Sequence, residues 1–384
     1  MYNNIVSIIH QSFYYERKKQ MELKLKTQEL QDMVGKAIKC VSNNKLIPLT
    51  SLMNIKVKNH VLTITTTDAT NYFYVRSFDA PCDDFEVSVI ADLFTKLVQK
   101  TTADTITLQV VDRVLKVMGN GTYTMELPLD ENGSVIKFPK KYESTDFMED
   151  PTTIKLSTIK TILASNKASL AISVELPSLT CYYCGDKVVT SDSYKICSTD
   201  IKAFNKPTLI SAPLMELLGV MDKEDISVLL NDSAMLFSTD TMDIYSPVTE
   251  GIDTFPIDAI NGLLDQEFES KCVVSRPAVL AIIDRLSLFV SPYDKKGIYL
   301  TFTKDGVMFS SKKSSGTELV PYISSENFHD YTCCIDVEML RSQVATQDID
   351  TLDISYGSDI AIKMTNNNIT QIVALMEDDR IKEA

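Results

Sequence analysis

Hydrophobic and polar residues along this chain follow two periods, and segments of the two kinds succeed one another in a fixed order. Residues 91–98 have apolar side chains three and four positions apart, which predicts an amphipathic helix. Residues 106–110 and 123–127 alternate between apolar and polar side chains, which predicts half-buried strands. A short helix followed by strands is therefore the expected building block of the chain.

This block of helix and strands occurs three times. The second copy begins at Ala212 and the third at Asp336. The first strands of the three copies start at Ile106, Ile226 and Leu352, which are 120 and 126 residues apart. Solenoid repeats have periods of roughly 20–50 residues, so units of this length predict three domains instead.

Another strand and helix precede each block. The first of these helices has Thr27 as its expected N-cap. Its buried stripe is expected to comprise Leu30, Met33, Val34, Ala37, Ile38 and Val41. Each repeat is thus predicted to contain two helices and about eight strands. Because alternating strands leave one polar face on each sheet, we expect an α+β fold of antiparallel sheets with helices segregated to one face.

The domain boundaries follow from this repeat. We expect an N-terminal extension at 1–20, then domains at 21–148, 149–268 and 269–384, with residues 140–151 as a polar linker. The extension combines apolar, aromatic and basic residues. It is interpreted either as a partner-binding helix or as a loose segment before a folded part that begins at Met21.

Composition narrows the class of protein. The 384 residues are 44% hydrophobic, the formal charge is −14 and the pI is about 4.8, which taken alone argues mildly against nucleic acid as a partner. The 8 cysteines lack the spacing of a secreted disulfide scaffold. Neither an apolar run of ~18 residues nor a basic secretory leader is found, so we expect a cytoplasmic protein without membrane spans.

Catalytic and metal chemistry is weakly signalled. Cys181 and Cys184 have CxxC spacing, but they lie in a predicted strand, on opposite faces, without a second ligand pair. The three histidines are scattered and no glycine-rich phosphate loop is found. We therefore predict a protein with no catalytic residues, no metal site and no cofactor.

Several local sequences add to the triplicated unit. They are Lys-Leu-Ile-Pro-Leu at 45–49, Phe-Pro closures at Phe138 and Phe255, Ser-Asp-Ser-Tyr-Lys-Ile at 191–196, and a final strand that ends at Met376. In order and spacing, the chain resembles the bacterial DNA polymerase III beta subunit, the sliding clamp, over about residues 21–376. Residues 191–196 are similar to the family's Thr-Asp-Gly-His-Arg-Leu, and the differences suggest a divergent or phage-type member.

This resemblance implies a DNA-clamp fold and a non-enzymatic function in DNA replication. Two protomers would pair head to tail into a homodimeric ring whose helices line a hole, while the sheets form the outside. The ring would encircle double-stranded DNA without sequence preference and tether the replicative polymerase as a processivity factor. Its partners would be DNA, the polymerase and the clamp loader.

The resemblance also gives the basic residues a role. Lysine and arginine opposite phosphates carry non-specific DNA binding, and a basic inner wall inside an acidic shell would hold DNA in the hole. Any one such residue is equally explained as part of a solvated helix face, so the interpretation rests on their recurrence. Residues 214–221 contain neither Lys nor Arg, so the basic lining is uneven. The expected DNA-facing residues are Lys36, Lys39, Lys45, Lys96, Lys100, Lys160, Lys167, Arg285 and Arg341.

A pocket for short linear peptides with hydrophobic anchors is the second implied site. Ser193 stands where the family usually has Gly, Tyr194 where it has His, and Leu375 where it has Pro, so the preferred peptide is expected to differ. Ile196 and Val373 are equally well explained as core residues. The carried-over pocket residues are Leu176, Ser193, Tyr194, Lys195, Ile196, Pro256, Met339, Val373, Leu375 and Met376.

The ring joint is the third implied site. It would bring Tyr123 and Met125 of one protomer against Phe289 and Val290 of the other. Large apolar side chains at a sheet edge are otherwise an association hazard, although an ordinary intramolecular core is an equal alternative from sequence alone.

Two other functions stay open. The first is a scaffold or decoy that keeps the clamp fold and its partners without encircling DNA. The second is an enzyme, such as a hydrolase, which would need a convergent cluster of buried carboxylates that the sequence does not reveal.

Overall fold

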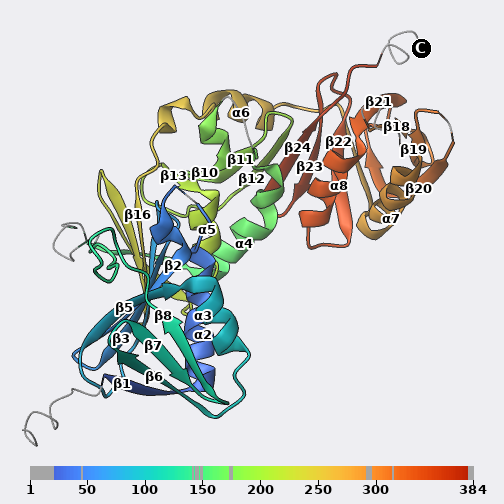
Figure 1. Ribbon diagram of the computed structural model, residues 1–384. Coiled ribbons are helices and arrows are strands. Elements are labelled where there is room, and N and C mark those ends of the chain that lie inside the picture. Colours follow the sequence, from blue (N-terminus) through green and yellow to red (C-terminus); the bar gives the residue numbers. More distant parts are fainter. Residues whose placement is uncertain are drawn as a thin grey trace, which may run out of the picture. The chain divides into compact units, whose positions relative to one another are not determined.

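The computed structural model describes residues 21–44, 46–140, 142, 147, 150–172, 176–290, 296–313 and 315–378 (Figure 1). The chain forms two compact units. Unit 1 is the chain up to Thr153 together with residues 220–247, and unit 2 is residues 154–219 together with the chain from Val248 onward. The expected extension at 1–20 and the predicted DNA-facing Lys45 lie outside the described residues.

The order of elements repeats three times, as the sequence predicted. The first repeat consists of β1 (Glu22–Lys26), α2 (Thr27–Ala37), β2 (Leu52–Lys58), β3 (Val61–Thr67), β4 (Tyr72–Ser77), β5 (Phe85–Ile90), α3 (Ala91–Gln99), β6 (Thr105–Val111), β7 (Val114–Met118) and β8 (Thr122–Glu126). The second consists of β9 (Thr152–Lys155), α4 (Leu156–Asn166), β10 (Cys181–Cys184), β11 (Val188–Ser191), β12 (Lys195–Thr199), β13 (Thr208–Ser211), α5 (Ala212–Leu218), β14 (Asp225–Leu230), β15 (Ala234–Ser238) and β16 (Met242–Pro247). The third consists of β17 (Ser270–Ser275), α7 (Arg276–Leu286), β18 (Gly297–Phe302), β19 (Gly306–Ser311), β20 (Thr317–Glu326), β21 (Tyr331–Asp336), α8 (Val337–Thr346), β22 (Thr351–Tyr356), β23 (Ala361–Asn366) and β24 (Ile369–Ala374).

Two details add to the predicted pattern. A short 3-10 turn follows the first helix of every repeat: η1 (Ile38–Cys40), η4 (Lys167–Ser169) and η7 (Ser287–Phe289). The second repeat also carries a further helix, α6 (Ile257–Leu264), directly after the predicted Phe-Pro closure. Proline cannot continue a strand ladder and is well placed at a helix start, so Pro256 marks both the end of the repeat and the beginning of α6.

The helices are short, with 11 residues in the longest. In α2, Leu30, Met33, Val34 and Ala37 are buried as predicted. The stripe was expected to continue to Ile38 and Val41, but α2 ends at Ala37 and these two residues are only partly buried. Thr27 is not the N-cap, however, because β1 runs directly into α2 and the Thr27 hydroxyl donates instead to the carbonyl of Ala103. Across the described residues, every helix falls short of the length and apolar character needed to cross a membrane.

Unit 1 contains two sheets. One has the strand order β1-β6-β7-β8, and the other the order β5-β2-β3-β4-β16-β15-β14-β9. Strand β4 of the first repeat and β16 of the second pair antiparallel, with Val75 opposite Met242, so strands from two repeats share one sheet. Helices α2 and α3 lie side by side (Figure 1), and Gln31 and Gln99 exchange hydrogen bonds between them.

Unit 2 is built on one sheet, with the order β13-β10-β11-β12-β24-β23-β22-β17-β20-β19-β18-β21. Strand β12 pairs antiparallel with β24, and Lys195 lies opposite Val373. The helices contact one another in the order α5, α4, α8, α7 and form a row. Helix α6 packs on the other face, because alternate residues of the paired strands enter different cores: Ile196 and Ile372 join α6, whereas Val373 joins α7 and α8.

The predicted polar linker contributes to the structure of unit 1. The Tyr142 ring stacks on Tyr245 and meets Tyr74 edge-on, and its hydroxyl donates to the carboxylate of Asp243. Arg76 of β4 forms an ion pair with Asp243 of β16 across the seam between the repeats. Burial raises the pKa of Tyr142, and the Asp243 carboxylate raises it further, so the phenol stays protonated and donates. The sequence did not predict this packing of Tyr142, because a single tyrosine does not change the polar composition of the segment.

Replacing Asp243 by Ala is expected to lower the free energy of unfolding by about 2–3 kcal/mol, because the partly buried Arg76 and the Tyr142 hydroxyl lose their acceptor. Denaturant unfolding followed by circular dichroism measures the loss. Asp240→Ala, in an exposed turn of the same hairpin, is the matched control. Adding Arg76→Met should recover part of the loss, and a double variant as unstable as the sum of the single changes would contradict this account.

Candidate functional site

The basic residues predicted to face DNA lie on helices or at their ends. In unit 1 they are on α2, η1 and α3, and in unit 2 on α4, η4, α7 and α8. None belongs to the hydrophobic cores. The described members of the set are Lys36, Lys39, Lys96, Lys100, Lys160, Lys167, Arg285 and Arg341.

Five of these eight cations are paired with carboxylates of their own unit. Such exposed pairs are each worth roughly 0–1 kcal/mol, so an incoming phosphate competes with them at modest cost. Hydrogen bonding to Arg285 lowers the pKa of Glu318, so that pair is charged at neutral pH. The pairs are Lys36–Asp32 at 2.7 Å, Lys96–Asp92 at 2.6 Å, Lys167–Glu216 at 2.6 Å, Arg285–Glu318 at 2.5 Å and Arg341–Asp284 at 2.7 Å.

The other three are the most available positive charges of the set. Lys39, Lys100 and Lys160 are exposed and, among the described residues, have no carboxylate within ion-pair distance. Helix α5 contains no Lys or Arg, as the sequence indicated, and its Glu216 neutralises Lys167. The positive potential of the helix row in unit 2 is therefore uneven.

The turn between β11 and β12 forms the centre of the predicted peptide pocket. The Asp192 carboxylate accepts hydrogen bonds from the backbone N–H groups of Tyr194 at 3.0 Å and Lys195 at 2.7 Å. The Ser191 hydroxyl accepts from the N–H of Ser193 at 3.1 Å. Ser193 itself has φ +76°, in the left-handed region that favours glycine, which explains why glycine suits this position.

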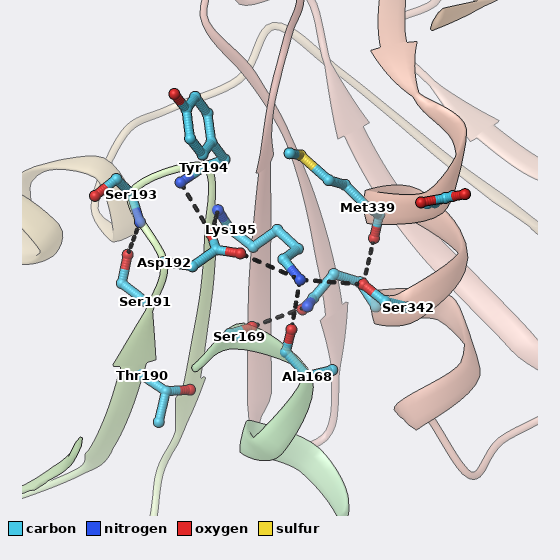
Figure 2. A network of polar contacts seen from close by, with 12 residues as sticks. Ala168, Ser169, Thr190, Ser191, Asp192, Ser193, Tyr194, Lys195, Met339 and Ser342 are labelled. Atoms are coloured by element: carbon cyan, nitrogen blue, oxygen red, sulfur yellow. Dashed lines mark hydrogen bonds and ion pairs between the residues drawn. The ribbon is translucent and has the colours of Figure 1, made fainter. Parts of the chain in front are cut away.

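Lys195 ties three elements together, as Figure 2 shows. Its ammonium group lies 2.5 Å from the carbonyl of Ala168, 3.3 Å from the carboxylate of Asp192 and 3.4 Å from the hydroxyl of Ser342 on α8. An ammonium group has three N–H donors, so these neighbours can use all of them. The side chain is only 13% exposed. Lys195 therefore joins the turn to η4 and α8, and its amine is not free.

The sheet separates the predicted pocket residues onto two faces. Ile196 is buried in the core beneath α6, together with Phe255. Val373 is buried in the opposite core, and Met339 and Leu375 pack against its edge. Ile196 and Val373 are thus core residues, the alternative that the sequence left open for them.

Tyr194 and Leu176 are the exposed hydrophobic members of the set, and Ser193 is exposed beside Tyr194. Tyr194 is 61% exposed and borders a groove of about 810 Å³ in unit 2. Leu170, Ile172 and Pro213 line the groove as well, and none of them was predicted. Nothing in the sequence marks Ile172 as exposed, because an isoleucine near a helix end is usually buried. Figure 2 shows Tyr194 and Met339 extending on either side of the Lys195 side chain.

The residues predicted for the ring joint lie at exposed edges. In unit 1, β8 is the last strand of its sheet, and Tyr123 is half-exposed whereas Met125 is buried. Both border a cavity of about 520 Å³ together with Leu93 and Leu97, and Lys96 and Lys100 line it as well. In unit 2, Phe289 is half-exposed in η7, and Val290, which follows it, packs on the core of the third repeat.

The thiols are sequestered. Seven of the eight cysteines are buried, and Cys82 is the one that is partly exposed. Burial raises the pKa of Cys197 and of Cys272 to about 12, and raises that of Cys184 as well, so these remain inert thiols at neutral pH. Within the described residues, His, Cys, Asp and Glu form no group of three or more that could hold a metal ion.

One Ser-His-Glu contact has the composition of a catalytic triad. The hydroxyl of Ser270 lies 2.7 Å from Nδ1 of His329, whose Nε2 is 3.8 Å from Glu269. Ser270 is fully buried, however, and its hydroxyl donates to the carbonyl of Asn327. Because a substrate cannot reach this oxygen, the arrangement does not supply a nucleophile.

Solved structures of DNA sliding clamps share this fold. The Bacillus subtilis DNA polymerase sliding clamp is 14% identical, with a TM-score of 0.81, and the comparison covers 94% of this chain and 100% of that one. DNA polymerase III subunit beta from Borrelia burgdorferi, solved in complex with a natural product, is 16% identical with a TM-score of 0.81, covering 93% and 98%. The beta subunit of Streptococcus pyogenes is 16% identical with a TM-score of 0.80, covering 93% and 100%. No curated protein matches the sequence.

The fold is therefore the DNA-clamp fold, α+β with antiparallel sheets, in agreement with the prediction. At the level of sequence, residues 21–132 match the family model of the DNA polymerase III beta subunit, N-terminal domain. The resemblance to that family, predicted from the triplicated unit and its local motifs, is confirmed.

Replacing Ser193 by Gly is expected to raise the free energy of unfolding by about 1 kcal/mol, because glycine adopts a φ of +76° without strain. Urea unfolding measures the change. Ser233→Gly, in an exposed turn whose backbone is outside the left-handed region, is the control and should be neutral or slightly destabilising. Equal effects of the two substitutions would contradict the interpretation of Ser193 as strained.

Proposed function

We propose that this protein is a DNA sliding clamp, which encircles duplex DNA as a homodimeric ring and tethers a replicative polymerase. The observation that carries the proposal is the recurrence of basic side chains on the helices of all three repeats of a clamp fold. The proposed domains are 21–148, 149–268 and 269–384, after an extension at 1–20. The site of action is the replication fork in the cytoplasm.

Electrostatics supports the DNA part of the proposal. The chain carries −14 overall, so DNA would be repelled by most of its surface. Lys39, Lys100 and Lys160 concentrate the opposite charge on helices, where backbone phosphates could be contacted without reading sequence. Because the other cations are already paired, the expected contact is weak, which suits a protein that must slide.

The edges of the two units support the ring joint. The apolar residues in the lining of the cavity beside β8 could receive an aromatic side chain, and Phe289 offers one at the surface of unit 2. A head-to-tail contact between identical chains closes into a ring when its rotation allows. The proposed joint therefore places Phe289 and Val290 of one protomer against Tyr123 and Met125 of the partner.

The exposed pocket residues support peptide binding. Tyr194 stands on a turn fixed by Asp192 and Lys195, and rigid exposed aromatics are effective anchors at interfaces. We expect the polymerase and the clamp loader to bind there through short linear motifs with hydrophobic anchors. The clamp has no proposed catalytic residues, metal or cofactor, since it acts by topological linkage.

A scaffold that keeps the clamp fold without encircling DNA is the second candidate. The five cations paired with carboxylates favour it, since they reduce the positive potential of the helices. The two candidates differ in whether the protein becomes topologically linked to DNA, and a loading experiment separates them.

The protein is loaded onto nicked circular DNA with a clamp loader and the complex is isolated by gel filtration. A ring should be retained on the circle and lost after the DNA is cut once to a linear form. Phe289→Asp should weaken the dimer by more than about 30-fold and abolish retention, because it puts a carboxylate into an apolar joint. Phe78→Asp, at an exposed phenylalanine outside the predicted sites, is the matched control. Retention that is unchanged by linearisation would favour groove binding over encirclement.

Removing the three available lysines should reduce the salt dependence of DNA binding. Each lost phosphate contact lowers the slope of log K against log salt by ~0.9, so Lys39→Ala, Lys100→Ala and Lys160→Ala together should lower it by up to about 3 per protomer. Fluorescence anisotropy of a short labelled duplex measures the slope. A control variant with Lys58→Ala, Lys223→Ala and Lys304→Ala, at a strand end and in turns, carries the same charge change. Equal slopes for the two triple variants would refute the helix face as the DNA contact.

A further inference from the structure

Residues 375–378, which follow the last strand, β24, remain in contact with the third repeat. After β24, the backbone N–H of Leu375 donates to the carbonyl of Ile360 and that of Met376 to the carbonyl of Cys334, each at 2.8 Å. Two residues further on, the Asp378 carboxylate accepts a hydrogen bond from the Tyr299 hydroxyl at 2.9 Å and forms an ion pair with Lys312 at 2.9 Å. Residues 375–378 are thus fixed to the third repeat at three points.

The slot that receives Asp378 is built by the surrounding strands. Tyr299 of β18 and Cys334 of β21 are cross-strand partners, so the tail follows the face of the sheet on which both lie. Gly297 leaves the space for Lys312, since a Cβ at this position would come within 2.4 Å of the lysine Cε and 3.0 Å of the Cys334 sulfur. A side chain at position 297 would therefore displace Lys312 from the slot.

The ion pair is sheltered from water. The side chains of Lys312 and Asp378 are 12% and 6% exposed, unlike the ion pairs on the helices. Burial alone would lower the pKa of Lys312, but the Asp378 carboxylate raises it above its ordinary value, so the amine is charged. A buried charge that loses its partner is strongly destabilising. The neighbouring Glu377 is exposed, so of these two adjacent carboxylates only that of Asp378 is buried.

The ion pair of Asp378 lies two residues along the chain from Met376, which belongs to the predicted peptide pocket. Leu375 and Met339 both pack against the hydrophobic core of the third repeat, and Met376 continues the segment of Leu375. The backbone of Leu375 and Met376 has no strand partner beyond Ile360 and Cys334 among the described contacts, so the next fixed point along the chain is Asp378. Loss of that point would free the end of the segment.

We propose that Asp378 is a positioning residue, which latches residues 375–378 onto the third repeat and thereby holds Leu375 and Met376 in place for peptide binding. This inference rests on the proposed peptide pocket. The latch itself is a property of residues 375–378 and can be measured without any ligand.

The experiment compares Asp378→Asn, Lys312→Met and Glu377→Gln in the full-length protein. Asp378→Asn and Glu377→Gln remove the same charge from adjacent residues, one latched and one exposed, so they form a matched pair. Hydrogen exchange of the Leu375 and Met376 amides reports the latch. A decapeptide selected on the wild-type protein from a displayed library, labelled with fluorescein and dependent on Tyr194, reports the pocket.

Asp378→Asn is expected to speed exchange of the two amides about tenfold and to weaken peptide binding about fivefold. Lys312→Met should have the same effects, and the two substitutions together should add little to either alone, as for members of one interaction. Glu377→Gln should leave both measurements unchanged. Equal behaviour of Asp378→Asn and Glu377→Gln in the exchange experiment would overturn the latch.

Two other outcomes separate the latch from the pocket. If Asp378→Asn loosens the amides but leaves the peptide affinity unchanged, the latch exists and its role in positioning is overturned. If the library yields no binder that depends on Tyr194, the proposed pocket fails, while the exchange data still decide whether Asp378 fixes residues 375–378.

Discussion

Antiparallel pairing between strands of different repeats is the constraint on which the rest of the structure depends. Strand β4 pairs with β16 in unit 1, and β12 pairs with β24 in unit 2, so sheets from separate repeats become continuous. Register is strict in such a pairing because a slip by one residue would exchange the two faces. The register of Lys195 opposite Val373 determines which side chains meet α8 and which meet α6.

That register also explains why neighbouring residues of one short turn differ in exposure, with Lys195 largely buried and Tyr194 at the surface. Lys195 points to the α8 side, where three acceptors surround its amine, while Tyr194 before it remains at the surface. Rigid support beneath an exposed aromatic is what a binding anchor needs, because little freedom is lost on contact. The cost of this arrangement is visible in the left-handed backbone of Ser193. Strain of this kind persists where surrounding contacts fix the chain, and here Ser191 and Asp192 do so.

The sequence was sufficient for the fold because its period is long and its patterns are strong. Helices such as α2 follow from the spacing of Leu30, Met33 and Val34, and the threefold order follows from blocks about 120 residues apart. What it could not supply was long-range geometry. Lys36 and Lys96 pair with carboxylates four residues earlier on the same helix, a spacing that the sequence does show. The other three ion pairs, such as Arg285–Glu318, join residues far apart in the sequence, so they were not predictable. The sequence also did not show that the predicted pocket residues lie on both faces of the sheet. Which face each residue takes depends on the register between β12 and β24, and a single sequence does not reveal that register. Tyr142 shows a third limit, because a single anchor in a polar segment leaves no periodic signal.

The burial of the thiols has a practical consequence. Of all eight sulfhydryl groups, Cys82 between β4 and β5 is the one that a reagent in solution can approach in the folded state. Burial raises its pKa, and Asp83 and Asp84 add to the effect, so alkylation should be slow at neutral pH and faster in mildly alkaline buffer. A maleimide dye would therefore label each protomer at one site without any cysteine being removed. Energy transfer between donor and acceptor dyes on Cys82 of different protomers would report whether protomers associate and whether they later dissociate.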